Sequence, residues 1–232
     1  MKTAILQITA TKKPPYRTKI GIRSSWLADI GFVCGVPVRA IPLPDGFILA
    51  LQDECNRHNG KLIHVGLDGT KLALTLNFAN NFTIAGLAAG DFLAARYEYG
   101  IITAKKLPPA QKYYVVASHN HGAFLRLNGA WLNDAGFLPD TIAMVAVQRD
   151  CISLRLWDET AESAASYSEI VKFARTHQYQ ILQAQKNQHI TIIDLDGYLL
   201  NRAGVNTGDI AGIHYEHGRI TLFKPDLQKL GF

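Results

Sequence analysis

The chain has 232 residues, of which 48% are hydrophobic and 19% are charged, and its formal net charge is +5. This balance is ordinary for a globular protein and leaves room for one large domain or two of common size. No run approaches eighteen apolar residues, the N-terminal segment lacks the cleavage site of a signal peptide, and the three cysteines form no Cys-x-x-Cys pair. We therefore expect reduced thiols, a cytoplasmic protein and no membrane partner.

Positive charge is concentrated in the first half of the chain. Residues 1–115 contain 14 Lys and Arg against 7 Asp and Glu, whereas residues 116–232 contain 10 against 12. No acidic residue occurs within residues 1–28. The asymmetry indicates a polyanionic partner for the first half, although a solvated basic arm without a partner has the same composition.

The first elements in chain order are two short strands and one turn of helix. "AILQI" at 4–8 and "TKIGIR" at 18–23 are the strands, and the second alternates between apolar and basic or small residues. In "SSWLADIGF" at 24–32, Trp26, Leu27 and Ile30 are spaced to place one apolar side on a sheet. Two further strands follow, and Asp45-Gly46 is the predicted hairpin turn between them.

This order of elements occurs four times. The stretches that begin at the helical turn and end after the hairpin are residues 30–51, 85–106, 135–156 and 203–224, each preceded by two predicted strands. A glycine ends each helical turn, and we expect it to adopt the left-handed conformation that closes a helix. We assign structural roles to these glycines and to the two tryptophans of the helical turns: Gly31, Gly86, Gly136, Gly204, Trp26 and Trp131.

One such repeat is too small to bury a core alone, so we expect the repeats to pair within the chain. The Pro-containing stretch "KKLPPAQK" at 105–112 predicts the domain boundary, giving a basic half at 1–107 and an acidic half at 112–232. Between the third and fourth repeats, "ETAESAASYSEIVKFARTHQ" lacks Gly and Pro and predicts the one substantial α-helix, near 160–176. The pattern leaves open which repeats pair.

The repeats resemble a known superfamily. "AGLAAGDFLAARYEYGIITAKK" and "AGVNTGDIAGIHYEHGRITLFK" are similar to AbrB-type swapped-hairpin domains, in which Gly-Asp precedes an alternating strand and a glycine hairpin. "LRLNGAWLNDAGF" resembles the "LxGxWLxxAGF" stretch of the SymE branch, and "IRSSWLADIGF" matches it in part. The resemblance implies a mainly β fold in which paired repeats interleave their hairpins into small AbrB-like β-barrels.

The resemblance also implies nucleic-acid binding and a link to toxin–antitoxin systems. We therefore expect a non-enzymatic protein that binds nucleic acid, duplex DNA rather than RNA, with no cofactor and no metal. Combining this expectation with the charge distribution, we predict that basic side chains of the first half contact backbone phosphates. They are Lys12, Lys13, Arg17, Lys19, Arg23, Lys61, Lys71, Arg96, Lys105 and Lys106.

Two alternatives stay open at this point. SymE relatives are described as RNA-cleaving toxins, and an endoribonuclease needs a general base and a group that stabilises the transition state. The histidines available for that task are His58, His64, His119 and His121. The other alternative is a protein-interaction module without nucleic acid, which contacts a protein partner through the acidic half.

Overall fold

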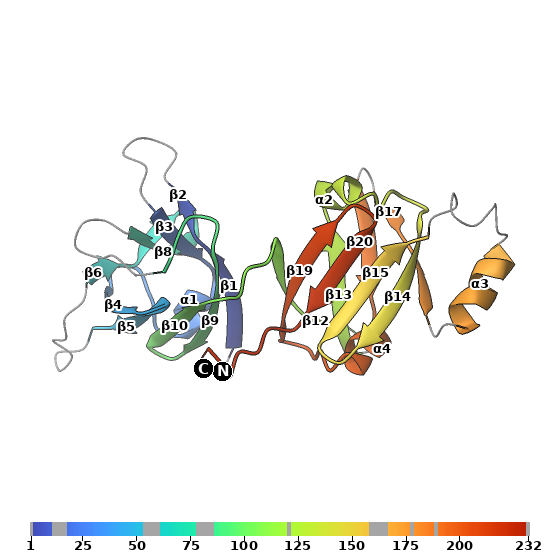
Figure 1. Cartoon of the computed structure of the whole chain (residues 1–232). Coiled ribbons are helices and arrows are strands. Elements are labelled where there is room, and N and C mark those ends of the chain that lie inside the picture. Colours follow the sequence, from blue (N-terminus) through green and yellow to red (C-terminus); the bar gives the residue numbers. More distant parts are fainter. Residues whose placement is uncertain are drawn as a thin grey trace. The chain divides into compact units, whose positions relative to one another are not determined.

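The computed structural model describes residues 2–10, 18–52, 61–77, 86–119, 122–157, 167–176, 179–187 and 190–230. Two units divide the chain: Met1–Pro109 with Asp226–Phe232, and Ala110–Pro225. Over the described ranges the protein is mainly β, with four short helices and antiparallel sheets, none of which closes on itself (Figure 1). The closed barrel implied by the resemblance therefore stays a prediction.

Two sheets form the first unit. The larger has the order β1 (Lys2–Gln7), β9 (Phe92–Glu98), β10 (Ile101–Lys106), β5 (Gly46–Leu51), β4 (Pro37–Leu43) and β6 (Lys61–His64). The smaller has the order β2 (Thr9–Ala10), β3 (Thr18–Arg23), β8 (Lys71–Asn77) and β7 (Gly66–Asp68). Phe47 and Leu93 of the larger sheet share one buried cluster with Ile22 and Leu74 of the smaller, so the core lies between the sheets.

The second unit repeats this arrangement. Its larger sheet has the order β11 (Lys112–Val115), β19 (Ile210–Glu216), β20 (Arg219–Phe223), β15 (Cys151–Leu156), β14 (Ile142–Gln148) and β16 (Gln180–Gln183). Its smaller sheet has the order β12 (Ala117–His119), β13 (Gly122–Asn128), β18 (Ile190–Leu195) and β17 (Gln185–Asn187). Leu127 and Ile193 of the smaller sheet are buried together with Val145 and Leu154 of the larger.

Strand pairing joins the first repeat to the second and the third repeat to the fourth. β1 of the first repeat pairs with β9 of the second, and β6 of the second repeat pairs with β4 of the first. In the second unit, β11 pairs with β19 and β16 pairs with β14 in the same exchange. The pairing that the sequence left open is thus between neighbouring repeats.

The leading strand of each repeat passes from the larger sheet to the smaller at one buried residue. Ile8 separates β1 from β2. The Ile8 amide donates to the Asp91 backbone oxygen at 2.9 Å, and the Ile8 backbone oxygen accepts from the Gly90 amide at 2.9 Å. Val116 makes the same two backbone bonds, with Asp209 and Gly208 of the fourth repeat. These bonds satisfy the backbone where the strand leaves its sheet, so each crossing is fixed by the other repeat of its unit.

The helical turns are α1 (Trp26–Asp29), α2 (Ala130–Asp134) and α4 (Gly197–Arg202); the equivalent segment of the second repeat, 81–85, lies outside the described residues. Each predicted closing glycine has a positive φ, which confirms the expected left-handed conformation. The angles are +88° at Gly31, +82° at Gly86, +83° at Gly136 and +73° at Gly204.

Two-residue turns close the four main hairpins. Gly100 and Gly218 adopt positive φ in their turns, and their amides donate to the backbone oxygens of Ile30 and Ala135 at 2.8 and 2.9 Å. The first hairpin differs from the prediction by one residue, because Leu43 pairs with Gly46 and the turn is therefore Pro44-Asp45. Gly46 is instead the first residue of β5, where a Cβ would overlap the backbone oxygen of Ala104.

The tryptophans of α1 and α2 each pack on a tyrosine from the other repeat of the same unit. The ring of Trp26 stacks on Tyr97 with centroids 3.9 Å apart, and the ring of Trp131 lies 4.8 Å from Tyr215. The indole N–H of Trp131 also donates to the Asn128 backbone oxygen at 2.7 Å. Both side chains thus join two repeats through aromatic packing.

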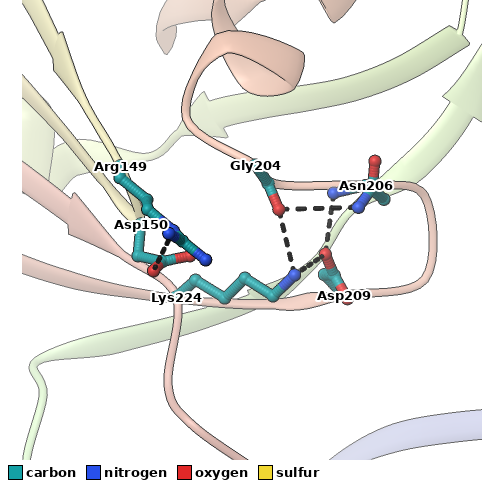
Figure 2. Close-up of polar contacts among 6 residues, drawn as sticks. All are labelled: Arg149, Asp150, Gly204, Asn206, Asp209 and Lys224. Carbon is teal, nitrogen blue, oxygen red and sulfur yellow. Dashed lines mark hydrogen bonds and ion pairs between the residues drawn. The ribbon is translucent and has the colours of Figure 1, made fainter.

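A side-chain clamp closes the glycine turn of the fourth repeat (Figure 2). Lys224 Nζ lies 2.6 Å from Asp209 Oδ2 and donates to the Gly204 backbone oxygen at 3.0 Å, while the Asn206 amide donates to Asp209 Oδ2 at 2.7 Å. The second repeat contains the same clamp, in which Lys106 Nζ lies 2.8 Å from Asp91 Oδ2 and 2.7 Å from the Gly86 backbone oxygen.

The predicted long helix is present as α3 (Tyr167–Thr176), the longest of the helices in the described part of the chain. Ile170 and Ala174 are buried, and the Tyr179 amide donates to the Ala174 backbone oxygen at 2.8 Å just after the helix. The predicted beginning of the helix, near 160, lies outside the described residues. The final segment, Asp226–Phe232, groups with the first unit rather than with the acidic half to which the sequence assigned it.

Candidate nucleic-acid interface

Strand alternation places three of the predicted basic residues on one face of the smaller sheet of the first unit. Ile20 and Ile22 of β3 point into the core, so Lys19 and Arg23 lie on the opposite, solvent side of the same strand. Lys71 lies on the same face of β8 as Ala73, the residue that pairs with Arg23, and the Lys71 side chain is exposed. We call the outer surface of β2, β3, β8 and β7 the basic face.

One end of the basic face gathers two lysines around the end of β8. Lys19 pairs with Asn77, and Lys61 of the larger sheet donates from Nζ to the Asn77 backbone oxygen at 3.0 Å. Ala10 and Thr18 pair at this same end of the sheet. Lys12, Lys13 and Arg17 belong to the connection between them and lie outside the described residues.

At the other end of the basic face an acidic residue partly neutralises the cations. Arg23 forms an ion pair with Asp68, and Asp68 pairs across the β7–β8 hairpin with Lys71. The side chains of Arg23 and Asp68 are 58% and 51% exposed, so this ion pair is a weak, solvent-screened one. Asp68 was not among the residues selected from the sequence, although the Gly69-Thr70 hairpin places it directly opposite Lys71.

Small residues separate the two charged ends. Gly21 pairs with Thr75, and Gly66 pairs with Ala73. A Cβ at Gly21 would meet nothing within 4 Å, so the middle of the face is open to solvent. Lys19 and Arg23 are four positions apart on β3, which corresponds to about 13 Å along the strand. The face is thus a shallow strip with cations at both ends.

The other predicted basic residues do not join this face. Lys106 is held in the clamp with Asp91, and Lys105 Nζ donates to the Leu230 backbone oxygen. Arg96 lies on β9 of the larger sheet, where it pairs with Thr3 and Thr103. Its position on the other sheet, and the contacts already made by the two lysines, separate these three cations from the basic face.

The equivalent face of the second unit has a different electrostatic character. Arg126 on β13 makes two hydrogen bonds to the carboxylate of Asp194, from Nε at 2.7 Å and from Nη2 at 2.8 Å. These bonds, followed by the attraction of the Asp194 charge, raise the pKa of the Arg126 guanidinium above its usual value. Arg126 also lies over the Phe124 ring at 5.5 Å, so its charge is already matched within its own sheet.

The histidines considered for RNA cleavage are spread over both units. His64 lies on β6 of the first unit, and His119 ends β12 of the second, 5.4 Å from the Phe124 ring. His58 and His121 lie outside the described residues. Within the described ranges, no group of three or more His, Cys, Asp and Glu side chains is arranged to hold a metal ion.

Comparison with models of protein families, with curated proteins and with solved structures finds no match to this chain. Among the residues that the structure describes, no helix has the length and apolar character needed to cross a bilayer.

Proposed function

We propose that the protein binds duplex nucleic acid, with DNA as the preferred partner, through the basic face. The observation that carries this proposal is the placement of Lys19, Arg23 and Lys71 on one exposed surface, with Lys61 at its edge. Ala10 and Thr18, which flank residues 11–17, pair next to Lys19, and residues 11–17 contain three further cations in sequence. Backbone phosphates are the groups that such a cluster attracts, and phosphate contacts supply most of the sequence-independent affinity for DNA.

The dimensions of the face favour a duplex. The two charged ends are about 13 Å apart along the strand, and the major groove of B-DNA is about 12 Å wide and admits a two-stranded ribbon. Lys19 and Arg23 can therefore reach phosphates on opposite sides of the groove. Gly21 and Ala73 carry little side-chain bulk between these ends, which allows close approach of β3 and β8.

The exchange of leading strands within each unit supports the AbrB-like and SymE-like assignment on which the regulatory or toxin–antitoxin role depends. In that assignment, each unit is the single-chain counterpart of a swapped-hairpin dimer, and its two sheets are the walls of a small barrel. The first unit binds nucleic acid. The second unit, with its acidic balance and its matched Arg126–Asp194 pair, takes a structural or protein-contact role in the same chain.

A salt titration of DNA affinity tests the proposal. Each phosphate contact contributes about 0.9 to the slope of log affinity against log salt, so Lys19→Gln with Arg23→Gln should flatten the slope by about 1–2. The matched control is Arg155→Gln with Arg219→Gln, which removes two exposed arginines from the second unit and should leave the slope unchanged. Equal slopes for the two double variants, or no duplex binding by the parent protein at moderate salt, would favour the protein-interaction alternative.

A second variant should change affinity in the opposite direction. Asp68→Asn removes the carboxylate that pairs with Arg23 and lies opposite Lys71, so it should strengthen binding and steepen the salt dependence. Affinity that stays constant, or falls, would contradict a phosphate contact at this end of the face. Incubation with RNA in parallel distinguishes binding from cleavage, because the proposal requires that RNA stays intact.

A further inference from the structure

Two arginines lie directly opposite each other in the second unit. Arg155 of β15 pairs with Arg219 of β20, and both side chains are exposed on the outer face of the larger sheet. Like charges placed opposite each other in an antiparallel pair oppose folding. At the equivalent positions of the first unit, Ala50 pairs with Ile101. The fold therefore does not need two cations at this place.

The charges of the two arginines are only weakly matched by the protein. Arg219 Nη1 lies 4.0 Å from Glu216 Oε1, and these side chains are 58% and 72% exposed. Within the part of the chain that the structure describes, Arg155 makes no ion pair. An exposed contact at this distance contributes little against the repulsion between two guanidinium groups. An anion between the arginines would remove that repulsion.

Both arginines line an open groove of about 1220 Å³ in this unit. Its lining includes Met144 and Gln148 of β14, Ser153 of β15, Tyr179 and the hairpin residue His217. The groove combines apolar, hydrogen-bonding and cationic side chains. The volume admits an organic molecule of nucleotide size, and the lining offers it both apolar and charged contacts.

Trp157 adds an aromatic ring to the same groove. It lines the groove, and its ring meets Phe173 of α3 edge-on, with centroids 5.4 Å apart. Its indole nitrogen is buried and donates to no acceptor among the described residues. The nitrogen itself is covered by the protein, so Trp157 offers a ligand in the groove its ring and not its N–H.

We propose that this groove binds a small phosphorylated organic molecule that carries a planar ring. The guanidinium groups of Arg155 and Arg219 hold the phosphate, because two adjacent forks match the charge and oxygen spacing of a phosphate dianion. Trp157 and Tyr179 supply the aromatic surface for the ring, because planar rings pack favourably on aromatic side chains. The site belongs to the second unit and does not depend on the basic face.

Calorimetric titration of the full chain with adenosine monophosphate, adenosine, pyrophosphate and succinate tests the proposal. We expect adenosine monophosphate to bind, adenosine and succinate to bind at least tenfold more weakly, and Arg155→Gln with Arg219→Gln to weaken binding of the nucleotide at least tenfold. The matched control, Lys19→Gln with Arg23→Gln, should bind it like the parent protein. Arg155→Lys with Arg219→Lys keeps the charge but not the fork, and should bind with intermediate affinity.

Several outcomes would overturn the proposal. They are no binding of adenosine monophosphate by the parent protein at millimolar concentration, equal binding by the Gln double variant, and equal affinity for succinate. Binding of pyrophosphate alone, with no gain from the nucleoside, would show an adventitious ion only. Circular dichroism of each variant verifies that the sheets are intact, so that lost binding reports the site rather than unfolding.

Discussion

The clamp of the fourth repeat predicts a strong energetic coupling between two surface-proximal residues. Lys224 and Asp209 are 28% and 26% exposed, so their contact is shielded from much of the solvent. Asp209 also accepts from the Asn206 amide, and Lys224 also donates to the Gly204 backbone oxygen (Figure 2). Substitution of either residue leaves the charge of the other without its ion-pair partner, and leaves one backbone group of this partly buried turn without its hydrogen bond.

The magnitude follows from the bonds that each substitution removes. Asp209→Val loses the ion pair and the bond to the Asn206 amide, and should destabilise the unit by about 2–3 kcal/mol, because hydrogen bonds to charged groups contribute about 1.5–3 kcal/mol. Lys224→Leu loses the ion pair and the bond to Gly204, and should cost about 2 kcal/mol on the same basis. Both losses are small beside the opposing free-energy terms of folding, but they are a large fraction of a typical net folding free energy.

The Asp209→Val, Lys224→Leu double variant should lose less stability than the two single variants together, because another repeat of the chain already has an apolar pair at these positions. At the aligned positions of the first repeat stand Val36 and Leu51, and the Val36 amide still donates to the Val33 backbone oxygen at 3.1 Å. Asp209 makes the same turn bond to Asn206 at 3.0 Å. The turn thus forms with an apolar pair in place of the ion pair, as expected when both partners are replaced together.

Urea unfolding of the parent protein, both single variants and the double variant measures the coupling. We expect an interaction energy of about 1–2 kcal/mol between Lys224 and Asp209. The same cycle at Lys106 and Asp91, which form the corresponding clamp, should give a similar value for the first unit. Additivity within about 0.5 kcal/mol in both cycles would refute the reasoning, because independent sites show that behaviour.

Two further predictions concern the backbone and alkaline pH. Gly46→Ala should destabilise the first unit by about 2–3 kcal/mol, because the new Cβ overlaps the Ala104 backbone oxygen between β5 and β10. Gly21→Ala, whose new Cβ has nothing within 4 Å, should be neutral or should stabilise the unit by up to about 1 kcal/mol. Equal urea unfolding midpoints for the two variants would contradict both expectations. Burial raises the pKa of Tyr113 to about 12, so the unfolded chain ionises first and stability is lost as the pH rises from 10 to 12. Tyr113→Phe should remove about 1 kcal/mol of that loss at pH 11, as measured by urea unfolding at pH 9 and 11, and an unchanged pH dependence would show that Tyr113 does not contribute.

Local patterns were sufficient to predict the main strands of the repeats and the helical turns of the first, third and fourth repeats. Alternation in "TKIGIR" placed Ile20 and Ile22 in the core and Lys19 and Arg23 on the outer face, because successive side chains of a strand point to opposite sides. The glycine that ends each helical turn required a left-handed conformation, and positive φ at Gly136 and its three counterparts agrees. The apolar spacing of "YSEIVKFA" likewise predicted α3.

Tertiary structure decided which of these residues come together. Charge alone made Lys106 and Lys19 equivalent candidates, but strand pairing brings Lys106 to Asp91 and leaves Lys19 on an open face. Nothing in the sequence near Arg155 indicates Arg219, because they belong to different repeats and meet only through the β15–β20 register. The period of a strand is a local property, whereas pairing between distant strands depends on the core that both must share, and only the folded chain specifies that partner.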